Sequence, residues 1–266
     1  MTATVEQKGS VSVEIDGAVA WAVISNPTRR NALSAAMMRD LHARLQELDK
    51  RPDVRAIVLR GEGSEAFVSG ADISEFESQH GSTDAKQAAD DAIAALFFGL
   101  AAMHTPTIAM VHGFCMGAGV AVALTADIRI ADEACAFAIP AARLGIAYPV
   151  PPTRVLQRMV GSGHAAEMLY TGGRVTAETA LSIGLVNRVV PKDQLHEAVR
   201  TLATTIAANS PMSVRAAKVA LASDLYPEML SEAEAFVAMC AGSDDAVEGG
   251  RAFMEKRRPK FTGVVS

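Results

Sequence analysis

Residues 107–131 read TIAMVHGFCMGAGVAVALTADIRIA and combine the patterns that indicate the fold class. An apolar, partly β-branched run opens the stretch, a glycine-rich turn follows at 112–119, and the small apolar residues 120–126 fit a buried helix. Residues 127–131 are again typical of a strand. A strand, a turn, a helix and a further strand in this order predict parallel pairing and therefore an α/β fold.

The same alternation extends toward the amino terminus. Strands are predicted at 11–15, 19–25 and 56–59, and helices after the N-cap Ser34 and at 88–103. Beyond Pro152 the pattern is mostly helical. We therefore predict an α/β core over residues 1–200 and a helical C-terminal region over 201–266.

Composition excludes several classes of protein. The 266 residues carry 25 Lys and Arg against 30 Asp and Glu, and 5% aromatic residues, so a nucleic-acid partner is not expected. The three cysteines are far apart and have no zinc-type spacing, so no metal site and a reducing compartment are predicted. The amino terminus lacks the apolar stretch of a signal peptide. The longest apolar run, 93–103, is too short to span a membrane, and we expect a cytoplasmic protein.

Two turns rich in small residues carry the functional signal. The first reads FVSGADI at 67–73, and the second reads HGFCMGAG at 112–119, directly before the predicted helix. Small residues let the backbone approach a ligand closely, and the N–H groups that open a helix attract negative charge. The chain contains no phosphate-binding P-loop, no complete dinucleotide fingerprint and no nucleophile elbow.

In this order and spacing, the two turns resemble those of the crotonase (enoyl-CoA hydratase/isomerase) superfamily. The segment NPTRRNAL at 26–33, the strand at 126–131 and the tail at 248–259 agree with the resemblance, which extends over residues 11–263. The resemblance implies a spiral of β-β-α units whose helical C-terminal region assembles a homotrimer or a dimer of trimers. It also implies an acyl-CoA thioester as substrate, with coenzyme A entering as part of that substrate and no separate cofactor.

By the same resemblance, the backbone N–H groups of Ala71 and Ala118 would hold the thioester oxygen while an enolate forms. Removing one such donor typically lowers the rate by ~10²–10³. Ala118 stands where a glycine is more common in the family, but an alanine offers the same N–H. Contacts to coenzyme A fall by resemblance on Arg29 and Arg30 for the phosphates, on the Ile73 backbone for the adenine, and on Phe253 and Lys256 of a neighbouring subunit.

The sequence departs from the family at its acid and base. Hydratases carry two glutamates that activate water and protonate the α-carbon, and both positions hold alanine here, Ala121 and Ala141. Each such group contributes ~10²–10⁴ to the rate, so ordinary hydration is not expected unless other residues, such as Glu75 or Glu77, replace them. Asp72 begins a D-x-x-E pattern and is predicted to cap a helix.

Tyr148 is the polar residue predicted nearest to the acyl end of the substrate. Its surroundings, RLGIAY at 143–148, are similar to the methylmalonyl-CoA decarboxylase branch, which has a tyrosine there but a histidine at the position of Ala71. Loss of CO₂ creates the enolate without a base, so decarboxylation suits a site without glutamates. Three hypotheses therefore stay open: a lyase or isomerase that uses the oxyanion hole, a hydratase with acid and base from elsewhere, and a non-catalytic acyl-CoA-binding protein.

Overall fold

The computed structural model describes residues 9–72 and 83–263 and arranges them around a six-stranded sheet. β1 (Ser10–Asp16) pairs antiparallel with β2 (Val19–Ser25) through a tight turn in which Gly17 has a φ of +60°. The other strands run parallel to β2 in the order β2-β3-β5-β7-β10. Their bounds are β3 (Ala56–Gly61), β5 (Thr107–Val111), β7 (Ile128–Asp132) and β10 (Arg188–Val190).

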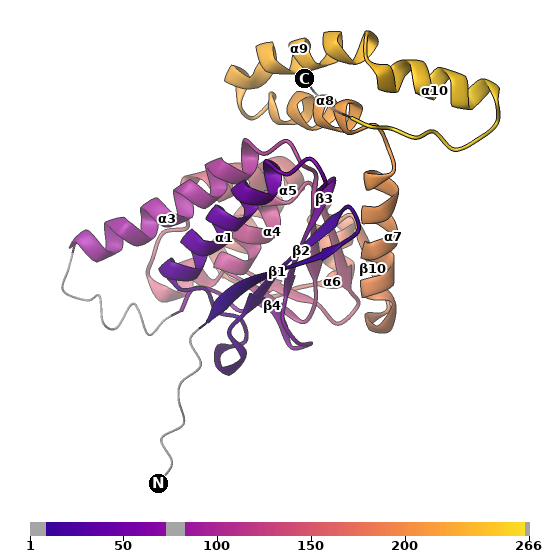
Figure 1. Ribbon diagram of the computed structural model, residues 1–266. Coiled ribbons are helices and arrows are strands. Elements are labelled where there is room, and N and C mark those ends of the chain that lie inside the picture. Colours follow the sequence, from indigo (N-terminus) through magenta and orange to yellow (C-terminus); the bar gives the residue numbers. More distant parts are fainter. Residues whose placement is uncertain (1–8, 73–82, 264–266) are drawn as a thin grey trace.

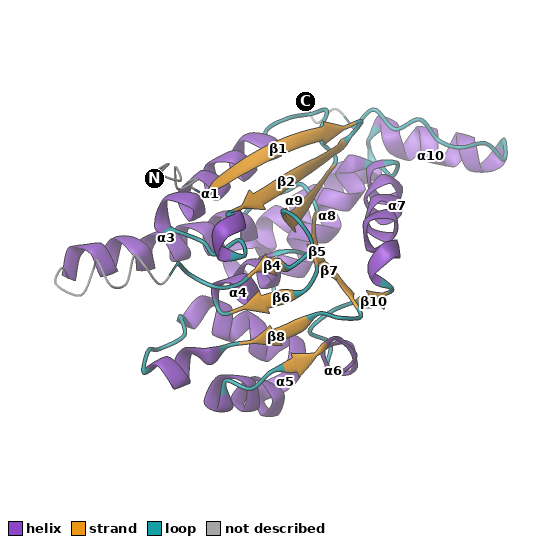
Figure 2. Cartoon of the chain, turned by 90° about the horizontal axis from the view of Figure 1, so that it is seen from below, coloured by secondary structure: helices purple, strands orange, loops and turns teal. Residues whose placement is uncertain are grey.

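A second, four-stranded sheet has the order β4-β6-β8-β9, and Figure 2 shows β4, β6 and β8 side by side. These three strands are parallel, and β9 pairs antiparallel with β8. Its strands are β4 (Ala66–Val68), β6 (Phe114–Met116), β8 (Ala136–Ala138) and β9 (Val175–Thr176). In chain order, β3 leads into β4, β5 into β6 and β7 into β8, and a helix follows each pair, so the chain repeats a β-β-α unit.

The short strands of the second sheet correct one expectation. The segments 67–73 and 112–119 were predicted as turns alone, but β4 ends inside the first and β6 lies inside the second. Both strands have only three residues. A run this short cannot show the two-residue alternation that identifies a strand, because each face then contributes only one or two side chains.

Helices cover both faces of the large sheet (Figure 1). Alternate residues of β2 face two cores: Ala20, Ala22 and Ile24 belong to the main core, whereas Val19 and Trp21 pack with α7. Ser34 caps α1 as predicted, since its side chain accepts the Met37 N–H. The helices of the body are α1 (Ala35–Asp49), α3 (Thr83–Ala101), α4 (Ala118–Thr125), α5 (Val150–Thr171), α6 (Ala177–Ser182) and α7 (Leu195–Ala207).

Three helices form a separate layer beyond α7, at one end of the molecule (Figure 1). They are α8 (Pro211–Ala222), α9 (Leu230–Ala241) and α10 (Asp244–Met254). The division predicted at residue 200 falls inside α7, whose apolar face packs on the large sheet. Within the described ranges, no helix is both long and apolar enough to cross a membrane.

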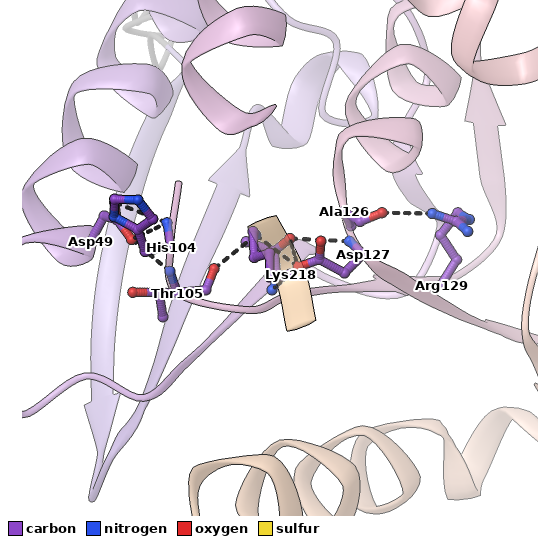
Figure 3. Close-up of polar contacts among 8 residues, drawn as sticks. Asp49, His104, Thr105, Ala126, Asp127, Arg129 and Lys218 are labelled. Atoms are coloured by element: carbon purple, nitrogen blue, oxygen red, sulfur yellow. Dashed lines mark hydrogen bonds and ion pairs between the residues drawn. The ribbon is translucent and has the colours of Figure 1, made fainter. Parts of the chain in front are cut away.

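An ion pair between a buried lysine and a partly exposed aspartate joins this layer to the body (Figure 3). The Lys218 ammonium of α8 is 8% exposed and donates to the Thr105 carbonyl at 2.9 Å and to Asp127 Oδ2 at 2.8 Å. The same carboxylate oxygen accepts the N–H and the hydroxyl of Thr107. Removing the carboxylate would leave a buried ammonium without its charged partner, which is costly, so the contact fixes α8 against the start of β5 and β7.

Candidate active site

The two predicted turns follow neighbouring parallel strands. Val68 of β4 is paired with Cys115 of β6, and the chain leaves both strands at the same edge of the small sheet. The amino-terminal end of α4 lies directly on β4, because a Cβ at Gly119 would come within 2.2 Å of the Val68 carbonyl oxygen. Only glycine permits this approach, which brings the start of α4 close to the first turn.

The first turn presents the N–H of Ala71. On either side of this residue, the Leu33 N–H donates to the Gly70 carbonyl and the Asp72 N–H donates to the Leu33 carbonyl, each at 2.9 Å. These bonds hold the turn in an extended bridge, and Gly70 reaches it with a φ of +132°. Within residues 9–72 and 83–263, no acceptor faces the Ala71 N–H, so this partly exposed donor is available to a ligand.

The second turn presents the N–H of Ala118. Ala118 is the first residue of α4 after the N-cap Gly117, whose own N–H donates to the Ala138 carbonyl at 2.8 Å. The first bond of the helix runs from the Ala121 N–H to the Gly117 carbonyl at 3.1 Å. The Ala118 N–H therefore has no intrahelical partner, and the part of the chain that the structure describes supplies no other acceptor. The positive end of the helix dipole lies at the same point.

Arg29 and Arg30 lie beside the first turn. Arg29 ends the short helix η1 (Pro27–Arg29), and Arg30 follows in the left-handed region with a φ of +49°. The Ser69 side chain donates to the Arg29 carbonyl at 2.9 Å and the Ser69 N–H donates to the Arg30 carbonyl at 3.2 Å. Buried Asn31 fixes this segment further, because its amide donates to the carbonyl of Ala66 at the start of β4.

Both arginine side chains already make contacts. Arg29 pairs with Asp72 at 2.9 Å. Arg30 pairs with Glu65 at 3.1 Å and lies over the Phe114 ring. Both Arg30 and Glu65 are largely exposed, and such pairs contribute little to stability, so Arg30 can exchange its partner at small cost. Ile73, predicted to contact the adenine, lies outside the described residues, as do the proposed substitutes Glu75 and Glu77 and the helix that Asp72 was predicted to cap.

Tyr148 is the predicted polar residue that the structure brings to the second turn. Its hydroxyl donates to the Gly117 carbonyl at 3.2 Å, across 31 residues of sequence. The side chain is partly buried against the main core, and this burial raises the pKa of the phenol above its usual value. The phenol is therefore protonated, and a hydrogen-bond donor, throughout the neutral range. No local spacing could reveal this contact with Gly117.

Ala121 and Ala141, the positions to which the resemblance assigns the family's glutamates, lie at the same edge of the small sheet. Ala121 is in the first turn of α4, and Ala141 is in the short helix η2 (Pro140–Leu144) that follows β8. Both are buried, at 7% and 8% exposure. Consecutive strands β4, β6 and β8 thus place Ala71, Ala118 and Ala141 in order, and none of these three residues supplies an ionisable group.

Phe253 and Lys256 lie elsewhere. Phe253 is 83% exposed near the end of α10, and Lys256 follows in the left-handed region with a φ of +52°. Figures 1 and 2 both show α10 far from β4, and Figure 2 shows it far from β6. One chain therefore does not bring these two residues to its own turns, and their predicted contact with the coenzyme A of a neighbouring subunit stays a prediction.

At the start of the second turn lie two buried residues, His112 and Asp132, which the sequence did not single out as a pair. His112 directly follows β5, and Asp132 is the last residue of β7. Asp132 Oδ2 accepts the Gly113 N–H at 3.3 Å. Burial lowers the pKa of His112, so the imidazole is neutral, as a structural histidine would be. Asp132 thus helps to hold the start of the turn. Among the described residues, no group of three or more His, Cys, Asp or Glu side chains could hold a metal ion.

Comparisons with known proteins agree with this geometry. The family described as enoyl-CoA hydratase/isomerase matches residues 14–264. The short-chain-enoyl-CoA hydratase of Clostridium acetobutylicum is 33% identical over 94% of this chain and 96% of its own length. The crotonyl-CoA hydratase of Syntrophomonas wolfei is 33% identical over 95% and 97%. A crystal structure of a family member from Hyphomonas neptunium has a TM-score of 0.90 at 37% identity and covers 96% of this chain and 98% of its own.

The fold, with its repeated β-β-α unit and its two turns at one edge of the small sheet, defines a protein of the crotonase type. The chain belongs to the enoyl-CoA hydratase/isomerase family. The predicted α/β fold with its crotonase-like spiral is thereby confirmed. At the level of the family, the protein acts on acyl-CoA.

Proposed function

We propose that this protein binds an acyl-CoA thioester with its carbonyl oxygen between the N–H groups of Ala71 and Ala118 and stabilises the enolate that forms there. The observation that carries the proposal is that two backbone donors, which follow β4 and β6, have no acceptor among the described residues. Preorganised donors of this kind need no rearrangement when charge develops, which is the reason that they stabilise an oxyanion well. The α4 dipole adds a favourable potential at Ala118.

Coenzyme A would bind along the first turn. Arg29 and Arg30 offer positive charge for its phosphates, and the Ile73 backbone is the proposed contact of the adenine. Phe253 and Lys256 would complete the site from a neighbouring subunit of a homotrimer or a dimer of trimers. Exposed apolar residues on the C-terminal helices, among them Phe253, Val247 and Leu221, support self-association, because large apolar surfaces are typical of interfaces.

The chemistry at this oxygen would not be ordinary hydration. Water addition needs a base for the water and an acid for the α-carbon, and alanines at 121 and 141 supply neither. An alanine side chain has no carboxylate, so a water molecule beside either position would find no base there to activate it. We therefore favour a lyase or isomerase reaction that depends chiefly on the oxyanion hole.

Decarboxylation is the second candidate, and Tyr148 beside the second turn favours it. When the bond between the α-carbon and a substrate carboxylate breaks, CO₂ leaves and the electron pair passes to the thioester oxygen. A proton from solvent then restores the α-carbon. A glutamate near the substrate carboxylate would repel it, so alanines at 121 and 141 suit such a substrate better than the family's glutamates.

Three measurements on the wild-type protein separate these functions. We expect butyryl-CoA, which cannot react, to bind in a calorimetric titration, and crotonyl-CoA to be hydrated very slowly. Release of CO₂ from malonyl-CoA or methylmalonyl-CoA would establish the decarboxylase, and rapid hydration of crotonyl-CoA would refute the oxyanion-only reaction. Binding without turnover of any thioester would indicate a non-catalytic acyl-CoA-binding protein, and no binding would refute the proposal.

The Ala118→Pro variant tests the oxyanion hole itself. Proline has no N–H, and the first position of a helix is where it is best tolerated, so α4 should still form. We expect turnover to fall by ~10²–10³. The control is Asp244→Pro, at the first position of α10 after the N-cap Ser243, which should leave turnover unchanged. Equal turnover of Ala118→Pro and the wild type would contradict the role of this N–H.

A further inference from the structure

The peptide unit between Gly117 and Ala118 carries two groups with different surroundings. Its N–H belongs to Ala118 and is the donor offered to the ligand, whereas its carbonyl belongs to Gly117 and is fully engaged. A peptide bond is planar and trans, so its N–H and C=O point in opposite directions. Whatever fixes the Gly117 carbonyl therefore also fixes the direction of the Ala118 N–H.

Gly117 gives this peptide room to rotate. Gly117 has a φ of +50° and a ψ of −108°, which favours glycine, and a Cβ there would meet no atom within 4 Å. The preceding peptide is anchored, because the Gly117 N–H donates to the Ala138 carbonyl of β8 at 2.8 Å. The following peptide has no such anchor on its N–H among the residues that the structure describes.

Two donors hold the Gly117 carbonyl. One is the Ala121 N–H at 3.1 Å, which is the ordinary first bond of α4. The other is the Tyr148 hydroxyl at 3.2 Å, which comes from the segment just before α5. The phenol thus stands behind the peptide, on the side opposite to the Ala118 N–H. From there it cannot donate to an oxygen that the Ala118 N–H also holds without leaving the Gly117 carbonyl.

We propose that Tyr148 is a positioning residue: its hydroxyl locks the Gly117–Ala118 peptide so that the Ala118 N–H stays directed at the thioester oxygen. A hydrogen bond to a carbonyl also polarises its peptide and strengthens the N–H on the other side. Tyr148 then acts through Ala118 and transfers no proton to the substrate. This inference rests on the proposed function for one point only, that Ala118 donates to a bound acyl-CoA.

The test follows the carbonyl stretch of bound butyryl-CoA labelled with ¹³C at the thioester carbon, by infrared difference spectroscopy. A carbonyl that accepts strong hydrogen bonds absorbs at lower frequency, so the wild type should shift the band downward on binding. In Tyr148→Phe we expect most of that shift to be lost while the dissociation constant changes less than about threefold, because one neutral hydrogen bond outside the ligand is removed. Tyr170→Phe, at an exposed tyrosine of α5, is the matched control and should leave the band unmoved.

A double variant tests whether the effect passes through Ala118. If it does, adding Tyr148→Phe to Ala118→Pro should move the band no further than Ala118→Pro alone, which is a strongly non-additive cycle. Replacing Tyr148 by 3-fluorotyrosine, whose more acidic hydroxyl is a stronger donor, should move the band further down than in the wild type. This variant keeps the ring and its hydroxyl and so remains informative if Tyr148→Phe does not fold.

The outcomes are distinct. An unchanged band in Tyr148→Phe together with lost turnover would overturn the inference and make Tyr148 a direct proton donor. An unchanged band with unchanged turnover would also overturn it and leave Tyr148 as packing. If the wild type did not bind butyryl-CoA, the proposed function itself would fail. If Tyr148→Phe binds butyryl-CoA and the band lies at the wild-type frequency, only the role of Tyr148 is refuted.

Discussion

Two polar regions of this molecule treat their hydrogen-bonding groups in opposite ways. Around Asp127, at the junction with the C-terminal helices, one carboxylate oxygen accepts from Lys218 and twice from Thr107, and the groups satisfy one another (Figure 3). At the ends of β4 and β6, the N–H groups of Ala71 and Ala118 have no acceptor among the described residues. The first arrangement stabilises a fold, and the second leaves donors for a ligand.

The difference also concerns side chains and backbone. The junction uses charged side chains, which a substitution removes. The turns use peptide N–H groups, which every residue except proline supplies. A substitution in the turns therefore acts on these donors through the position of the backbone.

The largest loss of stability is expected at the junction around Asp127, where the polar groups satisfy one another. Asp127→Ala leaves the buried Lys218 ammonium without its carboxylate, and we expect the free energy of unfolding to fall by about 3 kcal/mol, the lower end for a broken buried pair because Asp127 is itself partly exposed. Urea denaturation measures this loss. The control is Asp224→Ala, which removes the exposed partner of Arg158 and should cost less than about 1 kcal/mol. Equal losses in both variants would contradict the distinction between the two regions.

The next effect concerns the approach of α4 to β4. Gly119→Ala places a Cβ within 2.2 Å of the Val68 carbonyl oxygen, so α4 must move away from the first turn. We expect about 1–3 kcal/mol lower stability and weaker butyryl-CoA binding, because the two donors separate. Gly163→Ala in α5, where a Cβ meets no atom within 4 Å, is the control and should raise stability slightly. Unchanged binding in Gly119→Ala would show that the turns do not act as one site.

A smaller effect is expected at the edge of the site. Arg30→Gln removes a charge from an exposed side chain beside the first turn, and we expect coenzyme A esters to bind about 2- to 5-fold more weakly, as for one exposed ion pair. The difference should shrink as salt is raised, because exposed charges are screened. Arg44→Gln, on the exposed face of α1, controls for net charge. A difference that persists at high salt would argue against a phosphate contact.

The sequence predicted the larger elements well, because their apolar periodicity and caps are local. Ser34 marked the start of α1. The two turns were also found, since glycines and small residues identify them. What the sequence could not give were contacts between distant segments. The three-residue strands β4 and β6 and the bond from Tyr148 to Gly117 exist only once the chain has folded.

The smallest effect on stability is expected from His112, the first residue of the second turn. Burial lowers its pKa below the usual value of about 6.5, so the unfolded chain binds a proton that the folded protein refuses. Stability is therefore fully present above pH ~6.5 and declines as the pH falls toward the lowered pKa, with a slope of no more than about 1.4 kcal/mol per pH unit for this one group.

His112→Gln should flatten this slope, measured by urea denaturation at several pH values between about 7 and 5. His164→Gln, at an exposed histidine of α5, should not. The Asp132 carboxylate opposes the shift, whereas Lys192 and Arg60 reinforce it, so Asp132→Asn should steepen the slope of the wild type. An identical slope in His112→Gln and the wild type would mean that the imidazole is not held neutral.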